Sequence, residues 1–355
     1  METESLLNEI LAGRRMSNGE FAWLYQQGDL LAIGRAADQI RKRRFPDGLV
    51  TFIIDRNINY TNICSCRCKF CAFYRQPGDE DAYVLDQDTL FKKIEEAIRM
   101  GATQVMIQGG LNDALNIEYF EEMFRSIKER YEITIHSLTA PEIVFIAKNA
   151  GLSIRDTLLR LQRAGLDSLP GGGAEVLHDE VRQAISPNKI SSREWLTVME
   201  EAHRIGMRTT ATMMMGSLDR IEHRIHHLEQ IRQLQDQTGG FRSFIVWTYQ
   251  PGNNELAGEK LSSMLYLKFL ALSRLYLDNF DHIQGNWVTQ GKRIGQLSLF
   301  FGANDLGSIM LEENVVRATG LSQHIEEHEM VQLIKDAGRI PALRDTEYRV
   351  IKRFD

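Results

Sequence analysis

The chain has 355 residues, with 42 Lys plus Arg against 48 Asp plus Glu, and its formal net charge is −6. Hydrophobic residues make up 43% and charged residues 25%, which excludes intrinsic disorder and is typical of a globular protein. The mild acidity argues against a nucleic-acid partner, because contact with phosphates favours a basic surface. No run reaches the roughly 18 apolar residues that cross a bilayer, and no apolar stretch follows the acidic N-terminus. We therefore expect a cytoplasmic protein that does not bind membranes.

The first fifty residues predict a helical extension. A capping-box pattern at residues 17–20 begins one helix, and apolar residues at helical spacing predict a second helix over about 29–44. Residues 51–320 alternate strand-like runs with amphipathic helices and form the expected main domain. Residues 321–355 add a helix and an Arg-rich tail, which we expect to pack on the outside of that domain.

Eight strand candidates recur at intervals of a few tens of residues, with helices between them. They are residues 58–63, 104–108, 133–137, 168–169, 209–213, 244–247, 282–287 and 305–309. This alternation predicts an α/β fold, namely a (β/α)8 barrel of the TIM type, more readily than a doubly wound sheet. Functional residues of such a barrel gather at the C-terminal ends of the strands, and polar or glycine-rich segments do follow most of these candidates.

All four cysteines, Cys64, Cys66, Cys68 and Cys71, lie within eight residues of one another. This clustering argues against a disulfide framework and favours a metal or cluster site in a reducing compartment. A four-cysteine zinc site normally uses two separated Cys-x2-Cys pairs, and no distant cysteine is present. Cys64, Cys68 and Cys71 can instead hold three corners of an iron–sulfur cubane and leave one iron open. Cys66 is either a bystander whose side chain points away or a spare ligand.

The spacing C-x3-C-x2-C, with Phe70 just before the last cysteine, resembles the signature of radical S-adenosylmethionine (SAM) enzymes. The resemblance implies a [4Fe–4S] cluster whose open iron binds the amine and carboxylate of SAM. An electron from the cluster then splits SAM into methionine and a 5′-deoxyadenosyl radical. The alternative from another class is a zinc or electron-transfer protein without catalysis.

Three further segments resemble the SAM-binding parts of that family. Gln108-Gly109-Gly110 is similar to the segment whose backbone holds the methionine amine. Met214 occupies the apolar position of the segment under the adenine, and Glu175 follows a triple glycine and could contact the ribose or the amine. The alternative for each glycine group is a tight strand-to-helix turn.

Longer segments resemble the branch of the superfamily that serves menaquinone and deazaflavin biosynthesis, and within it the dehypoxanthine futalosine cyclases. The segments are residues 59–62, 64–75, 107–110, 136–143, 167–175, 185–190, 209–216, 287–291 and 301–316. The resemblance implies a small-molecule substrate, dehypoxanthine futalosine, and a reducing partner such as flavodoxin or ferredoxin. Hydrogen abstraction from the sugar, addition of the sugar radical to the aromatic ring and rearomatisation would give a spirocycle. Aminofutalosine synthase and the deazaflavin (FO) synthase subunit share these motifs and are the enzymatic alternatives.

Such a reaction needs polar residues that position the substrate and accept a proton. The candidates at or near strand ends are His136, Gln290, Asn304, Glu312 and Glu313. A structural hydrogen bond is the alternative role for each of them. A Lys or Arg should pair with the benzoate carboxylate of the substrate, but the sequence does not identify which one.

Three histidines at helical spacing form the remaining cluster of potential ligands. His223, His226 and His227 alternate with charged residues on one predicted helix. We therefore expect a solvated helix face here rather than a zinc site.

Overall fold

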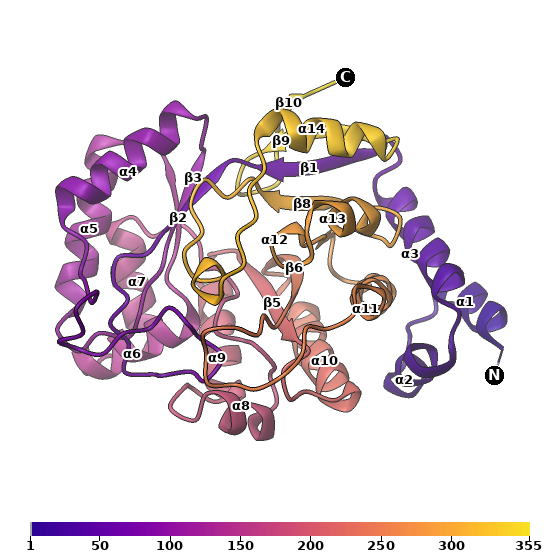
Figure 1. Cartoon of the computed structure of the whole chain (residues 1–355), viewed down its shortest axis with the longest axis horizontal. Helices are drawn as coiled ribbons and strands as arrows, with labels where there is room; N and C mark the ends of the chain where they lie inside the picture. Colours follow the sequence, from indigo (N-terminus) through magenta and orange to yellow (C-terminus); the bar gives the residue numbers. More distant parts are fainter. Residues whose placement is uncertain (1) are drawn as a thin grey trace.

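A closed barrel of parallel strands with helices around it forms the centre of the computed structural model, which describes residues 2–355 (Figure 1). The helices are α1 (Thr3–Leu11), α2 (Asn18–Gln27), α3 (Leu30–Arg44), α4 (Gln87–Arg99), α5 (Ile117–Arg130), α6 (Ala140–Ala150), α7 (Ile154–Ala164), α8 (Asp179–Ile185), α9 (Ser192–Arg204), α10 (Ile221–Thr238), α11 (Ser263–Tyr276), α12 (Trp287–Gln290), α13 (Lys292–Ser298), α14 (Glu327–Asp336) and the 3-10 turn η1 (Arg317–Thr319). The strands are β1 (Leu49–Ile53), β2 (Asp55–Ile58), β3 (Gln104–Ile107), β4 (Thr134–Ser137), β5 (Thr209–Met215), β6 (Phe241–Thr248), β7 (His282–Gln284), β8 (Asp305–Ser308), β9 (Ile340–Arg344) and β10 (Val350–Arg353).

Two sheets join to close the barrel. One runs β10-β9-β1-β8-β7-β6-β5 and the other β2-β3-β4. β1 and β2 are consecutive halves of one strand, so they connect the sheets on one side. On the other side Ser168 forms a parallel bridge to His136 of β4, and Leu169 forms one to Thr209 of β5. The prediction of a (β/α)8 barrel is confirmed.

The first barrel strand lies earlier in the chain than the sequence predicted. The prediction placed it at residues 58–63, whereas β1 and β2 span 49–58. The apolar run of β1 is buried between two parallel neighbours, β8 and β9, which explains why it lacks alternation. Residues 59–63 instead form an irregular segment with isolated bridges from Thr61 to Val84 and from Ile63 to Arg75. Side-chain bonds add to these bridges: Thr61 donates to the Tyr83 carbonyl at 2.6 Å and Asn62 to the Asp81 carbonyl at 2.8 Å.

The C-terminal tail is not a purely external attachment, which corrects the prediction. β9 pairs in parallel with β1, and β10 pairs antiparallel with β9 (yellow in Figure 1). Residues 344–348, here called the floor segment, then contact the N-terminal ends of four barrel strands. Arg344 binds Asp305 of β8, and Thr346 donates to Gln104 of β3 at 2.7 Å. Glu347 forms an ion pair with Arg242 of β6, and the Tyr348 ring stacks on His282 of β7. The floor segment therefore closes the bottom of the barrel.

The helices α1–α3 lie at one end of the molecule, beside the barrel helix α11 (Figure 1). Phe21 of α2 packs edge-on against Phe269 and Tyr276 of α11, with ring centroids 5.7 and 5.5 Å apart. Among residues 2–355, no helix combines the length and the apolar composition that a bilayer crossing requires.

The predicted solvated histidine face is wrong for two of its three members. All three histidines belong to α10; His226 is exposed, but His223 and His227 are buried on the inner face of this helix. The Nδ1 atom of His227 accepts the backbone N–H of Leu177 at 3.0 Å, and burial lowers the pKa of His227 to about 3. The His223 ring lies 4.4 Å from that of His178, centroid to centroid. The charged residues between these histidines therefore suggested an exposed helix face, although two of the histidines pack against neighbouring segments.

Candidate active site

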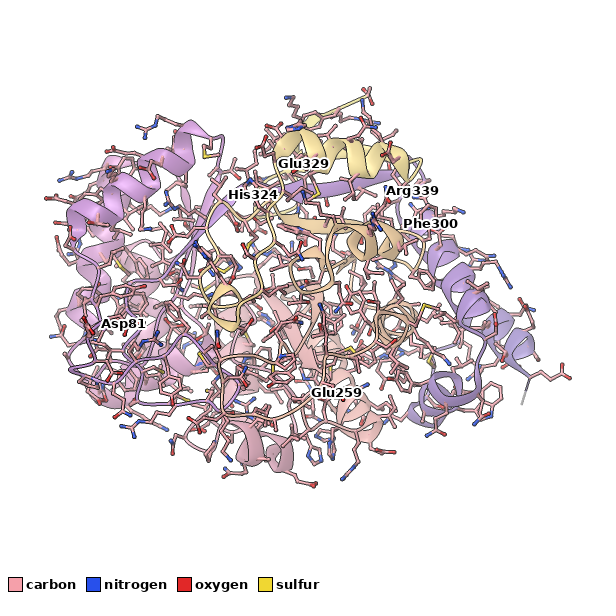
Figure 2. The ribbon with its side chains drawn as sticks, viewed as in Figure 1. Asp81, Glu259, Phe300, His324, Glu329 and Arg339 are labelled. Atoms are coloured by element: carbon pink, nitrogen blue, oxygen red, sulfur yellow. The ribbon has the colours of Figure 1, made fainter. Side chains whose placement is uncertain are left out.

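The cysteine loop follows β2 at the C-terminal end of the barrel and is held by separate segments of the chain. The backbone N–H of Ser65 donates to the Leu111 carbonyl at 2.9 Å, and that of Lys69 donates to the Ile185 carbonyl at 2.9 Å. On the outer edge of the loop, Arg75 forms an ion pair with Asp81, which is labelled in Figure 2. Hydrogen bonds from several separate elements therefore fix the backbone of this loop.

The thiols of this loop are largely removed from water. Cys64 Sγ accepts the backbone N–H of Leu111 at 3.3 Å. Burial raises the pKa of Cys64 and raises that of Cys71 to about 11, whereas a hydrogen bond from Cys66 lowers the pKa of Cys68 to about 7. The Cys66 and Cys68 sulfurs are 3.5 Å apart. Soft thiolate donors in one short loop, with an N–H donor already on one sulfur, fit an iron–sulfur cluster.

The turn after β3 packs directly on the cysteine loop. A Cβ atom on Gly110 would lie 2.1 Å from the Ile63 carbonyl oxygen and 2.7 Å from Cys64 Cβ, so only glycine fits. The Gly109 N–H donates to the Glu142 carboxylate at 3.0 Å, and this carboxylate also accepts the Tyr60 hydroxyl at 2.8 Å. Close packing and buried hydrogen bonds therefore place the Gln108–Gly110 segment beside the cysteines.

Glu175 and Lys189 form a buried ion pair on the same side of the loop. Lys189 Nζ lies 2.7 Å from Glu175 Oε1 and 5.2 Å from the centroid of the Phe70 ring. Glu175 Oε2 is buried and finds no hydrogen-bond donor among residues 2–355. Met214 is also buried, and its N–H donates to the Glu175 carbonyl at 2.8 Å. A buried carboxylate oxygen without a partner fits a donor brought by a ligand, such as the amine or a ribose hydroxyl of SAM.

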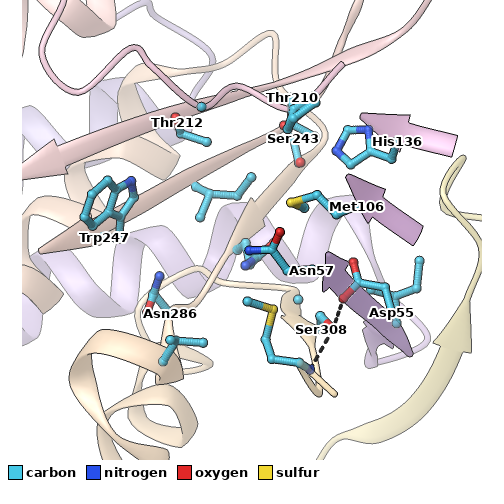
Figure 3. Close-up of a pocket in the computed structure, with 18 of the residues that line it drawn as sticks. Asp55, Asn57, Met106, His136, Thr210, Thr212, Ser243, Trp247, Asn286 and Ser308 are labelled. Atoms are coloured by element: carbon cyan, nitrogen blue, oxygen red, sulfur yellow. Dashed lines mark hydrogen bonds between the residues drawn. The ribbon is translucent and has the colours of Figure 1, made fainter. Parts of the chain in front are cut away.

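A cavity of about 290 Å³ runs through the barrel (Figure 3). His136 and Asp55 lie toward its floor, and Trp247 lies toward the end that carries the cysteine loop. Polar side chains between these levels project inward from several strands. They include Asn57, Thr210, Thr212, Ser243, Gln284 and Asn286. The cavity thus combines apolar walls with convergent polar groups, which is typical of a small-molecule site.

His136 lies at the side of this cavity, with Nδ1 2.8 Å from the Ser168 hydroxyl and 3.4 Å from Arg242 Nη2. The Ser168 hydroxyl also lies 2.8 Å from the Arg208 carbonyl. Nδ1 is therefore the engaged ring nitrogen, whereas Nε2 forms no hydrogen bond with residues 2–355. Burial and the nearby Arg242 guanidinium lower the pKa of His136 well below its ordinary value, which keeps the ring neutral.

Of the other predicted polar residues, Glu313 also lines the cavity. Its carboxylate accepts the backbone N–H groups of Val315, Val316 and Arg317, and burial raises its pKa. Glu313 therefore lines the cavity, and its carboxyl group is hydrogen-bonded to backbone N–H groups.

Three predicted residues lie outside the cavity lining. Gln290 donates to the Thr248 hydroxyl at 2.6 Å. Asn304 binds the Arg274 guanidinium at 2.5 Å and His282 at 2.8 Å. Glu312 forms ion pairs with Arg56 at 2.6 Å and Lys93 at 2.8 Å. Each side chain is therefore engaged in a structural contact.

The structure also identifies cavity residues that the sequence did not. They include Arg242, Trp247, Arg344 and Tyr348. Trp247 is the last residue of a predicted strand. Because functional residues gather at the C-terminal ends of barrel strands, this position could have identified it. The other three depend on a local irregularity of β6 and on the floor segment, and neither has a recognisable motif.

The barrel and the cysteine loop, with the Gln108–Gly110 turn and the buried Glu175 beside it, together define a radical SAM enzyme. Consistent with this, residues 58–231 match the Radical SAM superfamily, and residues 238–354 match the CofH/MqnC C-terminal region. The chain is 43% identical to the cyclic dehypoxanthine futalosine synthase of Halalkalibacterium halodurans (100% of this chain, 96% of the relative). It is 45% identical to that of Streptomyces coelicolor (98% of this chain, 88% of the relative). The chain therefore belongs to the cyclic dehypoxanthine futalosine synthase family of radical SAM enzymes.

A solved structure with low sequence identity has the same fold. Methylornithine synthase superposes with a TM-score of 0.74 at 19% identity, covering 95% of this chain and 97% of the other. The shared architecture therefore extends over the whole barrel and its extensions.

Proposed function

We propose that this protein converts dehypoxanthine futalosine to cyclic dehypoxanthinyl futalosine, a step of the futalosine route to menaquinone. The observation that carries this proposal is the 43–45% identity to two cyclic dehypoxanthine futalosine synthases over nearly the whole chain. This similarity includes both the cysteine loop and the C-terminal half that builds the cavity floor. The cavity below the loop supports the proposal, because it can hold both reacting parts of a single substrate molecule.

Cys64, Cys68 and Cys71 would hold the [4Fe–4S] cluster, and SAM would bind against Phe70, the Gln108–Gly110 segment, Glu175 and Met214. When bound, the cluster and SAM supply a 5′-deoxyadenosyl radical that removes one hydrogen atom from the sugar of the substrate. Because the cysteine loop lies at the C-terminal end of the barrel, the sugar must face that end of the cavity.

The cavity walls hold the sugar and the aromatic ring in contact and keep water away. Met106, Ile245 and Trp247 provide apolar surface, while Asn57 and Thr212 provide hydrogen-bonding groups for the sugar. Fixing the two reacting parts next to each other replaces an improbable encounter with a local one, which lowers the entropic part of the barrier. Excluding water protects the radical from side reactions.

His136 is the proposed proton acceptor. Once the new carbon–carbon bond has formed, the ring must lose one electron, which the oxidised [4Fe–4S] cluster held by Cys64, Cys68 and Cys71 would take up, and one proton to regain aromaticity. An oxidised ring of this kind is a strong acid, so a histidine of lowered pKa is a sufficient base. With its proton on Nδ1, 2.8 Å from the Ser168 hydroxyl, His136 presents the Nε2 lone pair to the substrate.

The reaction also needs a strong reductant, for which we propose reduced flavodoxin or ferredoxin. Since iron–sulfur clusters and free thiols persist in reducing compartments, we place the protein in the cytoplasm. Neither the donor nor the compartment changes the assignment of the cavity residues.

Product identification under oxygen-free conditions tests the function. The reconstituted enzyme, SAM, reduced flavodoxin and dehypoxanthine futalosine should yield the cyclic product together with an equal amount of free 5′-deoxyadenosine. The same mixture with the Cys71→Ala variant should yield neither compound. Retention of the adenosyl group in the product would instead identify an aminofutalosine synthase. Absence of SAM cleavage by an intact cluster would contradict any catalytic assignment.

A further inference from the structure

The substrate of the proposed reaction carries a benzoate carboxylate that the cavity must accommodate. A buried carboxylate without a cationic partner is strongly unfavourable. Of the lysines and arginines in residues 2–355, only Arg242 and Arg344 line the cavity. Arg344 is occupied, because its Nε and Nη2 atoms bind the Asp305 carboxylate at 2.6 and 3.1 Å. This leaves Arg242 as the cation with binding capacity.

A β-bulge turns Arg242 into the barrel. β5 and β6 pair Thr209 with Phe241 but Thr210 with Ser243, so Arg242 is the extra residue on β6. Phe241 packs outside the barrel against Phe280. Side chains alternate along a regular strand, and Ser243 faces inward, so an unbulged strand would direct Arg242 outward. Bulges commonly re-aim a side chain next to an active site.

The guanidinium of Arg242 has a donor to spare. Nη1 pairs with Glu347 of the floor segment, and Nη2 donates to the Ser168 hydroxyl oxygen at 2.5 Å. The Nε–H group is buried and meets no acceptor in the part of the chain that the structure describes, and the same holds for the hydroxyl of the adjacent Ser243. A buried charged donor is rarely left unpaired, and the Nε/Nη2 edge of arginine is one that chelates a carboxylate.

We propose that Arg242 binds the benzoate carboxylate, so that the aromatic ring lies at the barrel floor and the sugar points to the cysteine loop. This inference rests on the proposed function and specifies how its substrate is oriented. From Ser243 to Trp247, β6 rises by about 13 Å, which provides the length for an extended ligand between floor and loop. His136 Nδ1 lies 3.4 Å from Arg242 Nη2, so a ring anchored at Arg242 is adjacent to the proposed proton acceptor.

The surroundings of Arg242 are compatible with an incoming anion. Glu347 is 38% exposed and also lies 3.7 Å from Arg208, so it retains a second cationic partner. Asp55 is the acid that lines the cavity floor, and its carboxyl group is held by Ser308 and by Gln104 at 2.6 Å. Burial raises the pKa of Asp55.

The test compares two substrates on the reconstituted holoenzyme: dehypoxanthine futalosine and an analogue with a carboxamide in place of the carboxylate. For the wild type we expect kcat/KM to be about 100-fold higher for the carboxylate, as charge-assisted hydrogen bonds imply. Arg242→Met should lower kcat/KM about 100-fold for the carboxylate but less than about 3-fold for the carboxamide. The loss should lie mainly in KM, since the carboxylate is bound in the ground state as well as in the transition state.

Arg349→Met is the matched control, because it removes a charge beside the floor segment from an exposed residue outside the cavity lining. It should change neither substrate's kcat/KM by more than about 2-fold. Far-UV circular dichroism reports whether Arg242→Met is folded. If it is not, Arg242→Lys keeps the charge without the planar fork and should show a smaller loss that is again confined to the carboxylate.

Two failures are distinguishable. A wild-type enzyme that does not cyclise dehypoxanthine futalosine overturns the proposed function. A wild type that does cyclise it, combined with an unchanged carboxylate-to-carboxamide ratio in the Arg242 variants, overturns the role of Arg242 and leaves the function intact.

Discussion

The ion pair between Arg344 and Asp305 should be the main attachment of the floor segment to the barrel. The Asp305 side chain is fully buried and that of Arg344 is 7% exposed. Replacing Arg344 by Met leaves Asp305 with the Thr51 hydroxyl at 2.6 Å and the Gly307 N–H at 2.8 Å as donors. It also removes the guanidinium 3.8 Å above the Tyr348 ring. Breaking a buried pair in this way costs about 3–5 kcal/mol of unfolding free energy.

Urea unfolding of the reconstituted protein at pH 7, followed by circular dichroism without oxygen, measures this cost. Arg349→Met is the control: it breaks an exposed ion pair with Asp345 on the same tail, where we expect a loss of no more than about 1 kcal/mol. Asp305→Asn combined with Arg344→Met should recover part of the stability, because no buried charge then lacks a partner. A loss for Arg344→Met as small as that of the control would refute this account of how the tail docks.

Three further outcomes follow from the site and from α10. Cys71→Ala should abolish the cluster's electron paramagnetic resonance signal and 5′-deoxyadenosine release, whereas Cys66→Ala should largely retain both; equal losses would contradict the ligand assignment. Glu175→Gln should weaken SAM binding about tenfold or more in equilibrium dialysis while iron content stays unchanged, because the buried acceptor loses its charge. The pKa of His227 is about 3 when folded, below the ordinary 6.5, so its contribution to stability is complete above pH 6.5 and is lost as the pH falls toward 3. His227→Asn should therefore reduce the slope of unfolding free energy between pH 5 and 6.5 by up to about 1.4 kcal/mol per pH unit; an unchanged slope would exclude His227 as its source.

Local patterns predicted the features that local residues determine. The cysteine spacing identified the cluster loop, and the alternation of apolar strands with amphipathic helices identified the barrel. The start of the first strand was missed because β1 is buried on both faces and therefore shows no alternation. The polar residues that follow it, Asn59 to Asn62, resembled a strand only in their spacing.

Long-range contacts determined what the sequence could not predict. Glu312 follows an expected strand and Asn304 directly precedes one, but their partners Arg56 and Arg274 come from distant elements and hold the side chains away from the cavity. Arg242 faces inward because of one extra residue on β6, and no sequence rule shows where a bulge falls. A strand-end position therefore predicted proximity to the site, while the direction of each side chain depended on tertiary pairing.

The order in which the ribosome makes these elements has a consequence for folding in the cell. The wall of the barrel is complete in the nascent chain once β8 has emerged, but its base remains open to water until residues 340–348 follow. Until then Asp305 lacks its counter-ion and Arg242 lacks Glu347, so the interior is hydrated and its charges are uncompensated. Exclusion of water from the cavity therefore comes late in synthesis, after the eight barrel strands have formed. A translational pause before residue 340 would prolong the state in which the cavity is open at its floor.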